Sequence, residues 1–304
     1  MTSRLGGVAL VVGLLAGFVV TGCGADEVDE SAGSARVVAA FYPLAWVAEQ
    51  VGGGRVDVAN LTAAGAEPHD LELRPSQVAA VGDADLVIVL GGGFQPSVEA
   101  AVADRADGTL VALEALQGVA GGTGSGDVGE LDPHVWLDPV IMGDLVDEVA
   151  AALSAVDRDH TAGYRANAER VRAALVDLDR EFAAGLADCE RRELFTAHDA
   201  FGWLARRYDL EQHGVAGITP DQEPTPERLA ELSALVNETG ATTIFVETLV
   251  SAEVAETLAN EAGGLAVATL DPLEGLDDSG GGDADYLTVM RDNLAALRLG
   301  LTCT

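Results

Sequence analysis

The sequence contains no lysine: all 17 of its basic residues are arginine, against 50 aspartate and glutamate residues. The formal net charge is −33 and the isoelectric point is about 4.1. A surface of this sign repels the phosphates of nucleic acids and of anionic lipid headgroups, so both are excluded as binding partners. The charge favours the approach of cations, although an acidic surface also serves solubility alone.

No apolar run at the N-terminus is long enough to span a membrane. Val8–Val20 follows Arg4 and covers about 13 residues, which at roughly 1.5 Å each cannot cross a hydrocarbon core of about 30 Å. It fits the apolar region of a secretory signal peptide. Val20-Thr21-Gly22-Cys23 then resembles a bacterial lipobox, which implies a signal peptide at 1–22 and lipid attachment to Cys23. A plain signal peptide with an incidental cysteine is the alternative. Residues 23–35 are acidic and small, and we predict a flexible tether.

Cysteine is scarce as well, with three residues in the chain. If Cys23 carries a lipid, Cys189 and Cys303 remain. A secreted compartment permits disulfides, so one bridge between the middle of the chain and its C-terminus is consistent with this pair. Two buried free thiols are the alternative.

Strands and helices alternate in two separate stretches of the chain. Apolar runs such as ADLVIVL (84–90) and TTIFV (242–246) predict buried strands of parallel sheets. Between the stretches, apolar residues recur at three- and four-residue steps and predict two helices, the second over about His160–Ala187. We therefore predict an α/β fold of two βα lobes with mostly parallel sheets, joined by one long rigid helix. The boundaries are 36–143 for the first lobe, 144–187 for the helical linker and 188–304 for the second lobe.

Sequence motifs of common enzymes are missing. The chain has no H-E-x-x-H zinc helix and no G-x-S-x-G nucleophile turn. The glycine-rich residues 118–130 contain no basic residue and do not join a strand to a helix, so a phosphate-binding loop is a poor interpretation. We predict a surface loop there.

Three of the five histidines occupy matching places in this layout. His69 lies in Glu67-Pro68-His69-Asp70 after a predicted strand, and His134 lies in Asp132-Pro133-His134. His198 lies between a predicted strand and the next helix, and Asp271 in Asp271-Pro272-Leu273 has the same kind of position. Ligands of open α/β sheets bind at the carboxyl ends of strands, so we predict that His69, His134, His198 and Asp271 converge. His160, at a predicted helix start, and His213 are weaker candidates.

Three imidazoles and a carboxylate favour a transition metal. Neutral imidazole suits Zn²⁺, Cu²⁺, Fe²⁺ and Ni²⁺, whereas Mg²⁺ and Ca²⁺ sites use oxygen throughout. Zinc favours four ligands in a tetrahedron. The neighbouring acids Asp70 and Asp199 are candidate acceptors for the ring N–H groups. Each histidine alone suits a structural or exposed role, so the prediction rests on their combination.

The segments EPHDLELRPSQ, DPHVWLDP, FTAHDAFGWLARRYDLEQ, GITPDQEPTPERL and ATLDPLEGL resemble, in this order, the cluster A-I solute-binding proteins of ABC importers for zinc and manganese. The resemblance covers about residues 36–303. It implies a metal held in the cleft between the lobes, by His69 and His134 from the first and by His198 and Asp271 from the second. It also implies a disulfide between Cys189 and Cys303, delivery of the metal to a membrane permease, and no enzymatic activity.

The metal follows from the same resemblance. Histidine at the third ligand position is associated with zinc and glutamate with manganese, so His198 implies Zn²⁺, with Mn²⁺ as the second choice. One departure is that many zinc-binding relatives carry a histidine-rich loop where residues 118–130 contain no histidine, which puts a metal-gathering role of this loop in doubt. We expect a secreted monomer anchored to the outer face of the cell membrane. The alternatives are a Mn²⁺- or Fe²⁺-selective relative, a secreted zinc hydrolase with Glu247 as base, and an adhesin or metal-storage protein.

Overall fold

Short apolar runs form the centres of two parallel sheets. In the computed structural model, the buried strand β3 (Leu86–Val89) pairs with β1 (Ala35–Ala39). A strand that is covered on both faces must be apolar throughout, which explains why LVIV shows no alternation. The structure describes residues 34–116, 132–220, 224–249, 251–275 and 284–304. The predicted signal peptide, Cys23, most of the tether and residues 118–130 lie outside these ranges.

The two sheets share one strand order. The first runs β2-β1-β3-β4 and the second β6-β5-β7-β8, with every neighbouring pair parallel. The remaining strands are β2 (Val56–Asn60), β4 (Thr109–Val111), β5 (Glu193–Thr196), β6 (Glu211–Gly214), β7 (Thr243–Val246) and β8 (Ala266–Thr269). The helices that follow strands are α1 (Tyr42–Gly52), α2 (Pro75–Asp83), α3 (Pro96–Val102), α4 (Ala112–Ala115), α7 (Gly202–Arg207), α8 (Pro226–Thr239) and α9 (Glu253–Glu261). The predicted fold of two parallel βα halves is confirmed.

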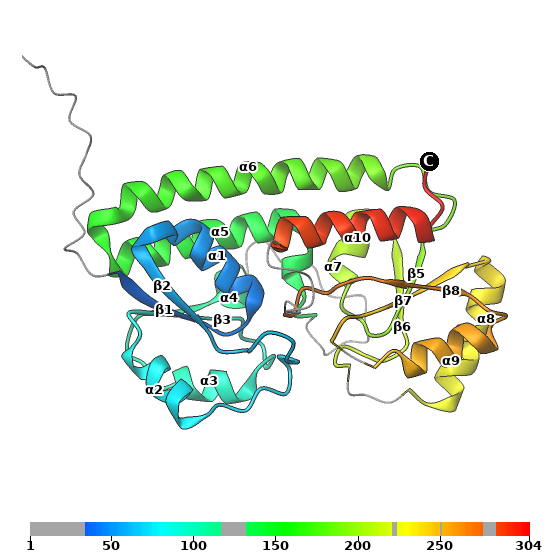
Figure 1. The fold of residues 1–304 in the computed structure, drawn as a ribbon, viewed down its shortest axis with the longest axis horizontal. Helices are drawn as coiled ribbons and strands as arrows, with labels where there is room; N and C mark the ends of the chain where they lie inside the picture. Colours follow the sequence, from blue (N-terminus) through cyan, green and yellow to red (C-terminus); the bar gives the residue numbers. More distant parts are fainter. Residues whose placement is uncertain (1–33, 117–131, 221–223, 250, 276–283) are drawn as a thin grey trace, which may run out of the picture. The chain divides into compact units, whose positions relative to one another are not determined.

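Two consecutive helices connect the halves (Figure 1). Helix α5 (Pro139–Val156) begins at Asp138, whose carboxylate accepts hydrogen bonds from the backbone N–H groups of Val140 and Ile141. This satisfies donors that the first helical turn leaves unpaired. Helix α6 (Thr161–Gly185) follows after a short 3₁₀ turn. The predicted boundary at 143/144 falls inside α5.

Helix α6 packs against elements of both halves. Its 25 residues make it about 37 Å long at about 1.5 Å per residue. Its buried residues recur at three- and four-residue steps and form one apolar stripe: Tyr164, Ala168, Val171, Leu175, Leu178 and Phe182. The stripe packs on α5, on α1 of the first half and on α10 (Tyr286–Gly300), which follows the second sheet. Among the described residues, no helix combines the length and the apolar character that a membrane span requires.

The end of the chain is attached to the segment after α6. A disulfide joins Cys189 to Cys303 across a sequence separation of 114. Backbone hydrogen bonds flank it, from Arg191 N to Leu301 O at 3.2 Å and from Thr304 N to Asp188 O at 3.0 Å. The bridge therefore closes a loop that contains the whole second sheet.

Asp157 stabilises the turn between α5 and α6. Its Oδ2 accepts hydrogen bonds from the Tyr164 hydroxyl at 2.6 Å and from Nδ1 of His160 at 2.7 Å. Burial raises the pKa of Asp157, but these hydrogen bonds outweigh it and hold the pKa below its ordinary value. The ionised carboxylate therefore stabilises the folded chain at neutral pH, and this contribution is lost as the pH falls through the lowered pKa.

We expect Asp157→Asn to lower the free energy of unfolding by about 1–2 kcal/mol at pH 7, because two hydrogen bonds lose their charged acceptor. The difference from the wild type should shrink below about pH 4, where the wild-type carboxyl also becomes protonated. Urea unfolding of the wild type and the variant at pH 7 and below about pH 4 measures the two differences in the free energy of unfolding. Asp159→Asn removes an exposed neighbouring charge and serves as the control. A difference that is constant with pH would contradict the assignment.

Candidate metal centre

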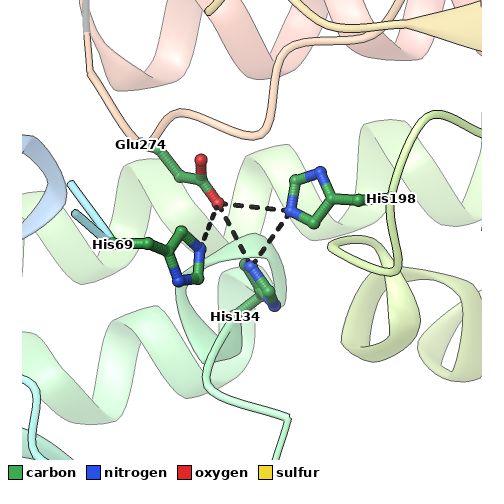
Figure 2. Close-up of side chains that lie close together, drawn as sticks. All are labelled: His69, His134, His198 and Glu274. Carbon is green, nitrogen blue, oxygen red and sulfur yellow. Dashed lines mark hydrogen bonds and ion pairs between the residues drawn. The ribbon is translucent and has the colours of Figure 1, made fainter. Parts of the chain in front are cut away.

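Four side chains from four separate loops converge on one point (Figure 2). His69 follows β2, His134 precedes α5, His198 follows β5 and Glu274 follows β8. One donor atom of each lies within 4.8 Å of the other three. The side chains of His134 and His198 are 0% exposed, that of Glu274 is 1% exposed and that of His69 is 8% exposed. The cluster is closed to solvent, and His69 is its most exposed member.

Four of the six distances between the donor atoms are close to the edge length of a tetrahedral zinc site. Oε1 of Glu274 lies 3.4, 3.1 and 3.5 Å from Nε2 of His69, His134 and His198, respectively. The Nε2 atoms of His134 and His198 are 3.4 Å apart. Ligands placed about 2.0–2.1 Å from zinc at the corners of a tetrahedron are about 3.3–3.4 Å from one another. The four side chains therefore have the chemistry of a transition-metal ligand set, and the donor atoms of Glu274, His134 and His198 also have its spacing.

Acid–proline–histidine turns shape the loops of His69 and His134. Oε1 of Glu67 accepts a hydrogen bond from the backbone N–H of His69 at 3.1 Å. Oδ1 of Asp132 accepts the corresponding bond from His134 at 3.0 Å. The intervening proline fixes φ near −65°, so the turn is partly formed by covalent structure. Each motif thus holds the backbone of its histidine in place.

Side chains on neighbouring strands hold the backbone of His198. Its carbonyl accepts hydrogen bonds from Thr196 Oγ1 at 2.7 Å and from Gln212 Nε2 at 3.0 Å. Its backbone N–H donates to Oε1 of Glu247, which directly follows β7, at 3.0 Å. The loop after β5 is therefore fixed by groups from β5, β6 and the end of β7.

Asp271, predicted as the fourth member of the cluster, lies elsewhere. Its Oδ1 accepts a hydrogen bond from Leu273 N at 2.7 Å, and its Oδ2 accepts one from Thr248 Oγ1 at 3.4 Å. Asp271 thus forms the same acid–proline turn as Glu67 and Asp132, and the turn uses its carboxylate. The carboxylate that joins the three histidines is Glu274. Leu273, between them, has the left-handed φ of 59°, which changes the direction of the chain just before Glu274.

The loops of His134 and Glu274 are bonded to each other directly. The indole Nε1 of Trp136 donates to Pro272 O at 2.7 Å, and the Tyr286 hydroxyl donates to Trp136 O at 2.6 Å. Asn293 on α10 pairs with the backbone of Asp271 through bonds of 2.8 and 2.7 Å. All three side chains are buried. The relative position of two of the four donors is therefore set by the protein itself.

The cluster is rich in buried negative charge. Burial raises the pKa of Glu274, but hydrogen bonds with His134, His198 and His69 hold it well below its usual value. Burial lowers the pKa of His198, but the contacts with Glu247 and Glu274 raise it to about 10. Burial and the nearby Glu274 raise the pKa of Glu67 to about 7. The carboxylates therefore need compensating positive charge, and a bound divalent cation supplies it in place of protons.

The remaining residues that the sequence predicted near the site do not contact the ligand rings. Asp199 accepts a hydrogen bond from the backbone N–H of Gly214 at 2.8 Å, and Asp70 is exposed; neither contacts a histidine ring. His160 belongs to the α5–α6 turn, and the ring of His213 packs 5.1 Å from that of Phe195. Asp132 and Glu247 instead approach the rings of His134 and His198.

Two parallel-sheet halves with four donors buried between their loops define a metal-binding protein of the solute-binding class. The family model described as "Zinc-uptake complex component A periplasmic" (ZnuA) matches residues 37–300. The chain belongs to this family, in agreement with the motif resemblance.

Individual relatives give the same result. The chain is 34% identical over 300 residues to the high-affinity zinc uptake system protein ZnuA of Bacillus subtilis, covering 92% of this chain and 93% of that protein. It is 33% identical to the zinc-binding lipoprotein AdcA of Streptococcus pneumoniae strain R6, covering 95% of this chain and 60% of AdcA. The crystal structure of the laminin-binding protein Lmb of Streptococcus agalactiae, described as a bifunctional protein with adhesin and metal transporting activity, superposes with a TM-score of 0.78 at 30% identity. That likeness covers 88% of this chain and 100% of Lmb.

Proposed function

We propose that this protein captures Zn²⁺ outside the cytoplasm, with His69, His134, His198 and Glu274 as its ligands, and delivers it to an ABC importer. The observation that carries the proposal is a buried set of three imidazoles and one carboxylate, in which the carboxylate lies 3.1 to 3.5 Å from all three ring nitrogens and two of these nitrogens lie 3.4 Å apart. Imidazole ligands favour zinc over the hard cations. The zinc-uptake and zinc-binding names of the relatives support the same metal.

The cellular placement follows from the N-terminal sequence and from the family. The lipobox-like Val20-Thr21-Gly22-Cys23 supports attachment of lipid to Cys23, and AdcA is named a lipoprotein. A lipid-anchored protein would release its metal to a permease in the same membrane. All four ligands come from one chain, so the site is complete in a monomer.

A catalytic role is disfavoured by the number of ligands. Catalytic zinc keeps an open position for water, whereas here four protein side chains are available as donors. Glu247, the candidate base of a hydrolase, already contacts both the backbone and the ring of His198. Capture and release therefore fit the site better than hydrolysis.

The proposal is tested by metal content. The chain from residue 24 onward is stripped of metal, offered equal Zn²⁺ and Mn²⁺, desalted and measured by mass spectrometry. We expect about one zinc and almost no manganese per chain, because imidazole-rich sites bind Zn²⁺ more tightly than Mn²⁺. Copper is left out because it binds most nitrogen sites more tightly than zinc whatever their function. One manganese per chain would overturn the choice of metal, and no stoichiometric metal would overturn the proposal.

A further inference from the structure

Glu247 contacts His198 at two atoms. Its Oε1 accepts a hydrogen bond from the backbone N–H of His198 at 3.0 Å. Its Oε2 lies 2.6 Å from the ring Nδ1 of the same histidine. Both side chains are buried, at 0% exposure for His198 and 2% for Glu247. A single carboxylate therefore bonds the backbone and lies against the ring nitrogen, although that second contact is not aligned as a hydrogen bond, while Nε2 points to the other donors.

Asp132 repeats this contact on His134. Its Oδ1 lies 3.0 Å from the backbone N and 2.9 Å from the ring Nδ1 of His134. The carboxylate itself is closely enclosed, since a Cβ added at Gly202 would lie 2.6 Å from Oδ2 of Asp132. The indole of Trp203 also donates to the Asp132 carbonyl at 3.0 Å. For both His134 and His198, one carboxylate thus contacts the backbone N and the ring Nδ1 of the same histidine. The acid lies two residues before His134, whereas for His198 it comes from the end of β7.

The chemical consequence concerns the tautomer of each ring. A neutral imidazole carries one N–H, and an ionised carboxylate can only accept. Pairing Nδ1 with a carboxylate places the hydrogen on Nδ1 and leaves the lone pair on Nε2, which is the atom directed at the cluster. The negative charge also makes the imidazole a stronger donor to a metal.

We propose that Asp132 and Glu247 are positioning residues that set the tautomer of His134 and His198, and thereby the affinity of the site for zinc. This inference rests on the proposed function. It assigns to Asp132 and Glu247 the role of carboxylate partners of a ligand ring. Asp132 lies two residues from its histidine in the sequence, and Glu247 lies 49 residues from its own. Removal of such a partner weakens metal binding by about 10- to 100-fold in comparable sites.

His69 provides an internal control. Glu67 accepts a hydrogen bond from its backbone N–H at 3.1 Å, but within the described part of the chain no acceptor contacts its ring Nδ1. Asp70, the exposed acid next to His69 in the sequence, contacts no histidine ring, so Asp70→Asn removes one negative charge near the site without changing a partner of a ligand. Glu247→Gln and Asp132→Asn remove the same charge, but they also allow an amide to face a ring N–H. Comparing the control with these two variants separates the effect of removing a charge from the effect of no longer holding the ring hydrogen on Nδ1.

The experiment uses the chain from residue 24 onward, which includes the whole compact unit Ser34–Thr304. Zinc affinity is measured by competition with a chelator, and thermal unfolding of the metal-free variants reports on folding. We expect one zinc per chain in every variant, with affinity about 10- to 100-fold lower for Glu247→Gln and for Asp132→Asn. Asp70→Asn should stay within about threefold of the wild type, because Asp70 contacts no ring nitrogen.

Nitrogen-15 spectra of labelled histidine supply a readout that a purely structural role would not change. With five histidines in the chain, the side-chain signals can be assigned by single substitutions. The zinc-loaded wild type should show protonated Nδ1 and metal-bound Nε2 at His134 and His198, and each variant should lose the Nδ1–H signal pattern of its own histidine alone. Equal affinities in all variants, or an equal loss with Asp70→Asn, would overturn the inference. A wild type without stoichiometric zinc would instead refute the proposed function.

Discussion

Glu274→Gln is expected to weaken zinc binding by at least about 100-fold, because it removes a ligand. Loss of a residue that only bonds to a ligand weakens binding by up to about 100-fold, and loss of the ligand itself should cost at least as much. The carboxylate of Glu274 is 1% exposed and lies 3.1 to 3.5 Å from all three ring nitrogens. An amide of the same size fills the same space without the charge. Chelator competition on metal-free protein measures the affinity, and the melting temperature in excess zinc gives an independent value through linkage.

Asp271→Asn is the matched control for this substitution. It removes one negative charge from the same loop, but asparagine also forms side-chain–backbone turns and can keep the bond to Leu273 N. We therefore expect zinc affinity close to that of the wild type. If Asp271→Asn abolished binding and Glu274→Gln did not, the fourth ligand would be Asp271, as we predicted from the sequence.

Removal of the disulfide is expected to lower the free energy of unfolding by about 4–5 kcal/mol, since the bridge closes a loop of more than 100 residues in the unfolded chain. For a domain of this size, that loss corresponds to roughly 10 °C or more in melting temperature. The measurement is denaturant unfolding of metal-free Cys189→Ser/Cys303→Ser protein, so that bound zinc does not mask the difference.

The single variants provide the control for this prediction. Either serine alone breaks the bridge, so each single variant and the double variant should unfold at the same denaturant concentration. The wild type in a reducing agent should reach the same value. An additive series would show that the sulfur atoms contribute through packing rather than through the bond, and a double variant as stable as the wild type would show that the bond does not stabilise the folded chain.

The fold was predictable because local pattern and tertiary environment agree. LVIV of β3 and TIFV of β7 are apolar without alternation and lie in the sheet interiors. The three- and four-residue steps of α6 predicted a helix over about 160–187, and the structure has it at Thr161–Gly185. The four-residue helix α4 was missed, since ALEA is too short to show any periodicity.

The site was predictable only in part, because a proline motif marks a turn rather than a ligand. Four of the five acid–proline pairs of the chain lie wholly within the described residues, at 67–68, 132–133, 138–139 and 271–272, and in each of these the acid accepts the backbone N–H two residues on. In the first two, histidine occupies that third position and joins the cluster. At 271–274, Leu273 occupies it and Glu274 follows. Comparing the four motifs would have identified Asp271 as the residue that forms the turn.

The acids that contact the histidine rings could not be identified from closeness to the histidines in the sequence. Asp70 and Asp199 are next to ligands in the sequence but point away, while Glu247 reaches His198 from the end of another strand. Such a contact depends on the β5–β7 pairing, which strand patterns do not specify. For His134 the partner is only two residues away, in Asp132-Pro133-His134, and the local turn brings it to the ring.

The three tryptophans of the chain give this protein an optical property. The ring of Trp136 lies 5.2 Å from that of His134, and Trp203 donates to the carbonyl of Asp132. Trp46 lies 4.8 Å from Tyr286, whose hydroxyl bonds to the Trp136 backbone. Two indoles thus lie at the centre, and the third is connected to it through Tyr286. We therefore expect the ultraviolet emission of the unlabelled protein to change when the metal binds or leaves, without an added dye.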